Sequence, residues 1–143
     1  MKIFILSFVI IFLSYGKYVY ASTEWDRLND KVGSLYQQGD YAGAIVIAKK
    51  THQMAEREFG PDHSNVAASL NNLATLYFVQ MQYSQARPLY KRALEIWINA
   101  LGSKHPDVAT GLENLAELQR KTRQDKEAES LEKRAATIRA MQR

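Results

Sequence analysis

The sequence predicts an all-α protein, specifically an α-solenoid of three antiparallel helix pairs. Apolar residues recur at spacings of three and four along most of the chain, which is the pattern of one buried helix face. The segment FGPDHSNVAASLNNLATL, residues 59–76, returns 42 residues later as LGSKHPDVATGLENLAEL, residues 101–118. A fixed period of this length is typical of stacked helical repeats. No stretch combines alternating polarity with β-branched residues, so no strand is expected.

Residues 1–21 have the layout of a signal peptide and not of a repeat. Lys2 precedes an apolar run over residues 3–13, and small and aromatic residues follow up to Ala21. A charged start, a short apolar core and a small residue at the end are the parts of a secretory signal. We expect cleavage after Ala21 and an exported, periplasmic or secreted protein whose repeat domain is residues 22–143. The alternative is an uncleaved N-terminal membrane anchor.

Composition argues against several functional classes. The chain has no cysteine, so export brings neither disulfides nor thiol chemistry. Its formal net charge of +4 is too small to indicate a nucleic-acid partner. Residues 120–143 carry an excess of basic side chains, which indicates either a solvated helix face or attraction to an acidic partner or an anionic membrane surface. The seven glycines are scattered singly, so no phosphate-binding loop is expected.

Each repeat is predicted to consist of two helices joined by a short turn. In the central repeat a helix over residues 65–80 is followed by a turn at Met81 and a helix over residues 83–101. Gly102 supplies the left-handed residue that a helix C-terminus favours, and Pro106 is tolerated in the first turn of the next helix. The predicted helices cover residues of about 24–37, 41–59, 65–80, 83–101, 106–122 and 125–141.

Small residues at one repeat position predict close contact between the helices of a pair. Ala44, Ala86 and Ala128 are spaced by one repeat, and a side chain no larger than a methyl group lets two helix axes approach. Trp97 and Ile98 leave two interpretations open, because one large apolar group falls outside a single stripe. An exposed patch there would favour association, whereas a buried one would be part of the core.

The spacing Leu70-x-x-Leu73-Ala74-x-x-Tyr77-x5-Tyr83-x-x-Ala86-x3-Tyr90-x-x-Ala93 resembles the tetratricopeptide repeat (TPR). The run LYKRALEI, residues 89–96, with GSKHPDVA after it, is similar to the 42-residue form found in kinesin light chains and many bacterial proteins. The resemblance spans residues 25–142, with repeats at about 25–60, 66–101 and 108–141. It implies a TPR superhelix that binds another protein or peptide, with no cofactor and no small-molecule substrate.

No catalytic or metal-binding arrangement is predicted. His63 and His105 occupy the same loop position in successive repeats, so they would lie too far apart to share one metal ion. Glu113 and Glu117 lie on one helix face, but nothing beside them builds the desolvated cleft that general acid–base catalysis requires. The sequence suggests no trio of serine, histidine and acid. We therefore expect a protein that is not an enzyme.

The resemblance also implies that the first helix of each pair lines a concave groove. The residues predicted to bind a partner in that groove are Asn29, Tyr36, Asn71, Asn72, Thr75, Phe78, Val79, Glu113, Asn114, Glu117, Arg120 and Lys121. Asp26, Gly33 and Gln37 share the same face.

Asn72 and Asn114 have two interpretations. Their amide groups could pair with the backbone of an extended peptide, or they could tie neighbouring helices together through backbone carbonyls. The apolar side chains of the groove, of which Phe78 is one, together with Arg120 and Lys121 favour a peptide that has an apolar stretch and an acidic flank.

Two functions from different classes follow from these observations. The first is an exported interaction module without catalytic activity that holds another polypeptide. The alternative is a structural or assembly subunit, which would associate weakly with itself or dock onto a peripheral membrane complex through its outer helices.

Overall fold

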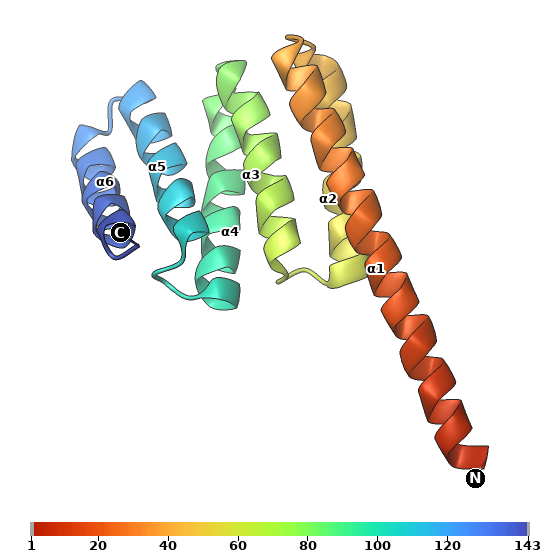
Figure 1. Ribbon diagram of the computed structural model, residues 1–143. Helices are drawn as coiled ribbons and strands as arrows, with labels where there is room; N and C mark the ends of the chain where they lie inside the picture. Colours follow the sequence, from red (N-terminus) through yellow and green to blue (C-terminus); the bar gives the residue numbers. More distant parts are fainter. Residues whose placement is uncertain (1, 143) are drawn as a thin grey trace.

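The structure is a stack of paired α-helices. This computed structural model describes the backbone of residues 2–142 and the side chains of residues 16–142. Its helices are α1 (Lys2–Gln37), α2 (Tyr41–Phe59), α3 (Ser64–Val79), α4 (Tyr83–Leu101), α5 (Pro106–Lys121) and α6 (Asp125–Ala140). Each helix packs most closely against its partner in a pair, and the pairs join through α2–α3 and α4–α5 contacts (Figure 1). The described backbone contains no strand, and the predicted solenoid of three helix pairs is confirmed.

Five of the predicted helices end within one residue of the observed bounds. The first, expected at about 24–37, was wrong at its start, because α1 begins at Lys2 and crosses the predicted cleavage site after Ala21. Gly16 is the one glycine between Lys2 and Ala21, and a single glycine weakens a helix without ending it. Of the predicted signal peptide, the side chains before Gly16 lie outside the described residues.

The N-terminal part of α1 extends past the end of α2 (Figure 1). Next to that extension, Lys17 Nζ lies 3.4 Å from Glu58 Oε2, and the rings of Tyr18 and Phe59 meet edge to face at 5.8 Å. Ala21 is buried. Residues just before the predicted cleavage site therefore contact the repeat domain. Among the helices whose side chains are described, none is long and apolar enough to cross a membrane.

Small residues bring the two helices of each pair together. Ala44, Ala86 and Ala128 each have 0% of their surface exposed, which confirms the predicted contact position. Leu70 and Leu112, one repeat apart on α3 and α5, are equally well buried. Because the repeated alanines leave no gap to fill, the larger side chains of the inner helices pack directly against the outer ones.

The segment over residues 94–98 belongs to the core. Trp97 is 4% exposed, and Ile98 packs against the same buried cluster. Gly111 on α5 makes room for the indole, since a Cβ atom at that position would lie 3.3 Å from the Trp97 ring. The interpretation as core is confirmed, and the exposed association patch is wrong.

Left-handed residues close every turn at a fixed repeat position. Gly39, Met81 and Arg123 are 42 residues apart and have φ angles of 77°, 59° and 60°. Gly60 and Gly102 fill the corresponding position between pairs, at φ angles of 91° and 89°. The positive φ expected of Gly102 is confirmed, but its ψ of 152° lies outside the left-handed helical region. Met81 and Arg123 adopt a conformation that glycine would adopt without steric cost.

Replacing Met81 or Arg123 by glycine should therefore raise the free energy of unfolding by about 0.5–1 kcal/mol, because the steric cost removed exceeds the entropy cost of glycine. Urea denaturation measures the change. Gln80→Gly is the matched control, since Gln80 has a φ of −86° and gains nothing from glycine. If Met81→Gly destabilised the protein as much as Gln80→Gly, the turn would carry no such strain.

Candidate functional site: the concave face

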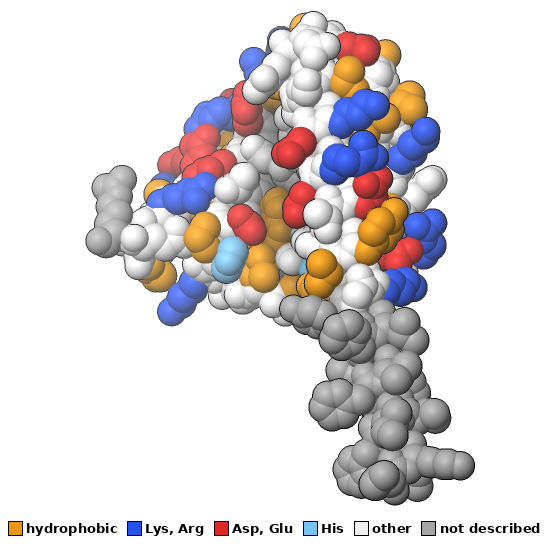
Figure 2. Space-filling view, turned by 45° about the vertical axis from the view of Figure 1, so that its right-hand side comes forward, with side chains coloured by type: hydrophobic (Ala, Val, Ile, Leu, Met, Phe, Trp, Pro, Cys, Tyr) orange, Lys and Arg blue, Asp and Glu red, His pale blue; other side chains and the backbone are white. Residues whose placement is uncertain are grey.

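The helices α1, α3 and α5 form the inner layer of the stack, and α2, α4 and α6 form the outer layer (Figure 1). α3 packs directly against α5, and a side-chain hydrogen bond joins α1 to α3. All twelve predicted binding residues lie on these inner helices. Figure 2 shows that this face is hollowed, with acidic side chains on both sides of the hollow.

A pocket of about 220 Å³, here called the α1–α3 pocket, opens between the first two inner helices. Its lining residues are Asn29, Val32, Gly33, Tyr36, Asn72, Thr75 and Leu76. Four of these were predicted as binding residues, and none of the seven carries a charge. Val32 and Leu76 are buried core residues, so the floor is apolar while asparagine and threonine supply polar groups at the walls.

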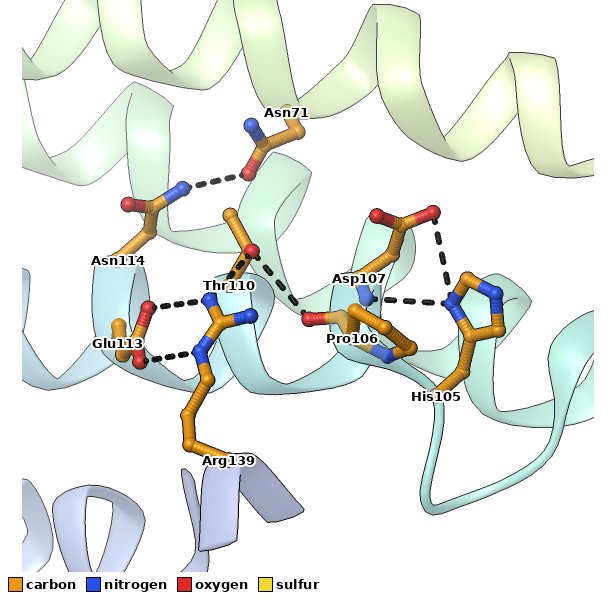
Figure 3. Close-up of polar contacts among 8 residues, drawn as sticks. All are labelled: Asn71, His105, Pro106, Asp107, Thr110, Glu113, Asn114 and Arg139. Atoms are coloured by element: carbon orange, nitrogen blue, oxygen red, sulfur yellow. Dashed lines mark hydrogen bonds and ion pairs between the residues drawn. The ribbon is translucent and has the colours of Figure 1, made fainter. Parts of the chain in front are cut away.

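Asparagine side chains bridge successive inner helices. Asn72 Nδ2 donates to Asn29 Oδ1 at 3.0 Å, and Asn114 Nδ2 donates to Asn71 Oδ1 at 2.8 Å (Figure 3). The two bridges are equivalent positions one repeat apart. Of the two interpretations of Asn72 and Asn114, the structure therefore supports the tie between helices. The acceptors are side-chain oxygens and not the backbone carbonyls that the sequence suggested.

The row of bridges ends at Glu113, which stands where Asn71 and Asn29 stand in the earlier repeats. No fourth inner helix follows in the described chain, and Arg139 of α6 takes the carboxylate instead. Arg139 donates to both oxygens of Glu113, at 3.1 and 2.9 Å, and to Thr110 Oγ1 at 2.9 Å (Figure 3). In the third repeat an ion pair between α5 and α6 thus stands in place of the asparagine bridge, and Glu113 is already occupied.

Arg120 is likewise occupied by α6. Its guanidinium donates two hydrogen bonds to Glu132, at 2.7 and 2.6 Å, and lies 3.9 Å from Asp125. These hydrogen bonds lower the pKa of Glu132 below its ordinary value and raise the pKa of Arg120. Arg120 was expected to attract an acidic flank of a peptide, but the structure surrounds it with two carboxylates of its own chain.

Thr75 connects the α1–α3 pocket to the core. Its Oγ1 lies 3.0 Å from the hydroxyl of Tyr90, which reaches across from α4, and also donates to Asn71 O at 2.9 Å. Burial is the main reason that the pKa of Tyr90 rises to about 12, and the hydrogen bond to Thr75 opposes that rise. The phenol is therefore neutral in the physiological range and serves as a fixed hydrogen-bonding group beneath the pocket.

Aromatic pairs brace the same edge of the first two repeats. Tyr36 meets Tyr41 with ring centroids 5.5 Å apart, and Phe78 meets Tyr83 at 5.4 Å. Tyr36 remains exposed, whereas Phe78 packs against the core. Of the other predicted residues, Val79 is half-buried at the end of α3, and Glu117 and Lys121 are exposed on α5.

The loop histidines cap helices. His63 Nδ1 accepts a hydrogen bond from the backbone N–H of Asn65 at 3.1 Å, and His105 Nδ1 accepts one from Asp107 at 3.2 Å (Figure 3). Each satisfies a free N–H group at a helix start, as an N-cap does. Among the described side chains, no group of three or more histidine, aspartate and glutamate residues could hold a metal ion.

The structure brings together a trio that the sequence did not suggest. His52 Nδ1 lies 3.1 Å from Ser69 Oγ, its Nε2 lies 3.6 Å from Glu56, and Glu56 pairs with Arg92 at 2.7 Å. Burial lowers the pKa of His52. Ser69 is 1% exposed and donates to the Val66 carbonyl, so a substrate has no path to its hydroxyl. His52 and Glu56 lie on α2, Ser69 lies on α3 and Arg92 lies on α4, so these four side chains join three neighbouring helices.

Sequence reasoning found the inner face but missed the pocket floor and the partners of its polar groups. Val32 and Leu76 were absent from the predicted set because apolar residues at helical spacing indicate core before they indicate a site. The asparagine bridges could have been predicted from the spacing of the asparagines. Asn29 and Asn71 are one repeat apart, and so are Asn72 and Asn114. Two such sets of asparagines, each repeated at the same interval, are expected where the side chains of one inner helix meet those of the next.

Comparison with known proteins agrees with this architecture. The family model described as a tetratricopeptide repeat matches residues 28–81 and 66–140. The crystal structure of BtubC (BKLC) from P. vanneervenii is similar, with a TM-score of 0.75 and 26% identity over 82% of this chain and 47% of that one. Nearly identical TPR-like repeats of a Podosopora anserina protein named as a kinesin light chain give a TM-score of 0.73 and 22% identity, covering 80% and 55%. The chain spans about half the length of these structures. No curated protein matches the sequence.

Asn114→Ala should lower the free energy of unfolding by about 0.5–1.5 kcal/mol, because Asn71 loses its hydrogen-bond donor. Adding Asn71→Ala should cost less than the sum of the two single changes, since both remove the same bond. Urea denaturation of the four proteins of this cycle measures the coupling. Asn99→Ala, at an exposed position of α4, is the control and should stay within about 0.5 kcal/mol. Strict additivity would mean that the bridge does not hold the helices.

Proposed function

The chain belongs to the tetratricopeptide-repeat family, with repeats of the kinesin-light-chain type, and on this basis we propose that it is a non-catalytic module that holds an extended segment of another polypeptide in its concave groove. Proteins of this family are generally interaction modules that bind other proteins or peptides. The observation that carries the proposal for this chain is the α1–α3 pocket, which opens on the hollowed inner face (Figure 2).

The groove has the chemistry that an extended segment requires. Its floor at Val32 and Leu76 is apolar and can take a side chain, while asparagine amides along the walls can meet a peptide backbone. The bridge uses one hydrogen of the Asn72 amide nitrogen and leaves the second hydrogen and the carbonyl oxygen for other partners. The bridging role of Asn72 is therefore compatible with contact to a ligand.

The alternative, assembly through the outer helices, has less support. The apolar group that could have made an association patch, Trp97, is buried in the core. The outer face of α6 carries mainly charged side chains, such as Lys126, Glu127 and Arg134. Such a face is well solvated and does not favour association through apolar contact. We therefore place the partner in the groove and keep self-association and docking onto a membrane complex as outcomes to be tested.

We propose further that the chain acts outside the compartment in which it is made, because residues 1–21 have the layout of a secretory signal. Native protein should then begin at Ser22, which N-terminal sequencing or intact mass will show. Ala21→Leu removes the small residue before the cleavage site and should leave the longer precursor. If the native protein keeps residues 1–21 and sediments with membranes, the N-terminal anchor is the right alternative.

Site-specific photocrosslinking tests the groove. A benzoylphenylalanine at Tyr36 faces the inner side, and the same group at Lys50 lies exposed on the outer side of α2. In extracts of the native cell, the Tyr36 protein should form an adduct with another polypeptide, and the Lys50 protein should form none. Adducts from Lys50 alone, or adducts only between copies of this chain, would favour the assembly function.

A further inference from the structure

We propose that the groove selects a basic segment, in which an uncharged apolar side chain enters the α1–α3 pocket and Lys or Arg residues lie on either side of it. This inference rests on the proposed function and deepens it. It replaces the expectation of an acidic flank, which depended on Arg120 being free.

The α1–α3 pocket disfavours a charged side chain and has room for a large apolar one. None of its lining residues is charged, and its volume of about 220 Å³ suits one side chain of the size of leucine, methionine or phenylalanine. Gly33 opens one wall, because a Cβ atom there would meet nothing within 4 Å. A charged side chain placed over Val32 and Leu76 would lose water without gaining a partner.

Acidic groups flank the pocket along the groove. Asp26 lies two helical turns before Gly33, on the same side of α1, and Glu117 occupies on α5 the position that Thr75 has on α3. Both are exposed, and neither has a basic group within 4 Å among the described side chains. Burial is the main reason that the pKa of Tyr90 is raised, and the negative charge of Glu117 adds to the rise, which is consistent with a carboxylate near the Tyr90–Thr75 contact beneath the pocket.

The basic groups of the inner layer do not balance these acids. Arg27 of α1 is held by Glu24, and Arg120 of α5 is held by Glu132 and Asp125. Arg139, which reaches the inner layer from α6, is held by Glu113. Lys31 lies two residues from Gly33 and hence on the opposite side of α1. Lys121, at the end of α5, is the remaining inner-face cation without a carboxylate within 4 Å in the described part of the chain. Figure 2 shows acidic side chains on both sides of the hollow, among basic ones.

The positive charge of the chain lies elsewhere. Each outer helix carries two adjacent basic residues at the same repeat position, and all six are exposed: Lys49, Lys50, Lys91, Arg92, Lys133 and Arg134. The outer layer thus accounts for much of the overall charge of +4, while the groove keeps an excess of carboxylates. A cationic segment would be attracted to the inner face and repelled by the outer one.

Selection from a library of short random peptides displayed on phage tests the proposal, with residues 22–143 and the full chain as baits. Enriched peptides should combine an apolar residue with Lys or Arg on its flanks. In fluorescence anisotropy, Asp26→Asn with Glu117→Gln should weaken an enriched peptide about three- to tenfold, and raising the salt from about 0.05 M to about 0.5 M should do the same. Glu127→Gln, on the outer face of α6, is the control and should change nothing.

Gly33→Leu fills the pocket and should weaken the same peptide about tenfold or more. The change replaces a helical glycine by a good helix former at an exposed position, so the thermal midpoint should stay equal or rise. Ser34→Leu, the neighbouring exposed position outside the pocket, is the matched control and should keep binding. Loss of binding with Gly33→Leu but not with Ser34→Leu supports the pocket.

Two results would overturn the inference, and they differ in what they leave standing. Enrichment of acidic or neutral flanks, with binding still abolished by Gly33→Leu, would refute the basic segment and keep the proposed peptide groove. Peptides whose binding survives Gly33→Leu, or no enrichment at all, would refute both the basic segment and the groove.

Discussion

The close approach of the two helices in each pair is the constraint on which the rest of the structure depends. Ala44, Ala86 and Ala128 lie at the contacts with no exposed surface, so each pair has one fixed separation. The distance between successive inner helices then follows from the distance between pairs. At that distance, asparagine side chains on two neighbouring inner helices can form a hydrogen bond. A larger residue at these alanines would push the helices apart and would also disturb the inner layer, because the groove width is set by the pairs behind it.

What could be predicted from the sequence was local or periodic. Gly102, Pro106 and the repeated alanines act within a turn or at one repeat interval, and helix ends followed from them within a residue. The start of α1 could not be predicted in this way. The layout of a signal peptide indicates export, but residues 2–21 contain no residue that would end a helix. The binding face was predictable from the repeat, but its charge was not. Whether Arg120 is free depends on where α6 places Glu132, and that is decided only when the helices pack.

The third repeat differs from the first two in the contacts at its edge. In the first two repeats an aromatic pair braces the edge, as Phe78 does with Tyr83, whereas in the third the corresponding residues are Arg120 and Asp125. The row of asparagines likewise gives way to Glu113 with Arg139. Ion pairs that tolerate water thus replace the neutral contacts of the first two repeats. The third repeat therefore carries charged pairs at these positions, while the neutral and apolar part of the groove lies toward the N-terminal side.

The composition of α3 has a consequence for how the domain opens. This helix has no charged side chain along its length and contacts α2, α4 and α5. If the first helix pair, α1 and α2, detached from α3, Leu73 and Leu76 would be exposed to water on a surface without charged side chains. This opening would cost free energy, but it would leave the other two pairs folded. The α1–α3 pocket lies between the first helix pair and α3. A ligand in the pocket would contact both, so its binding free energy would add to the free energy that holds the first pair against the rest of the domain. The partner would therefore stabilise the fold to which it binds.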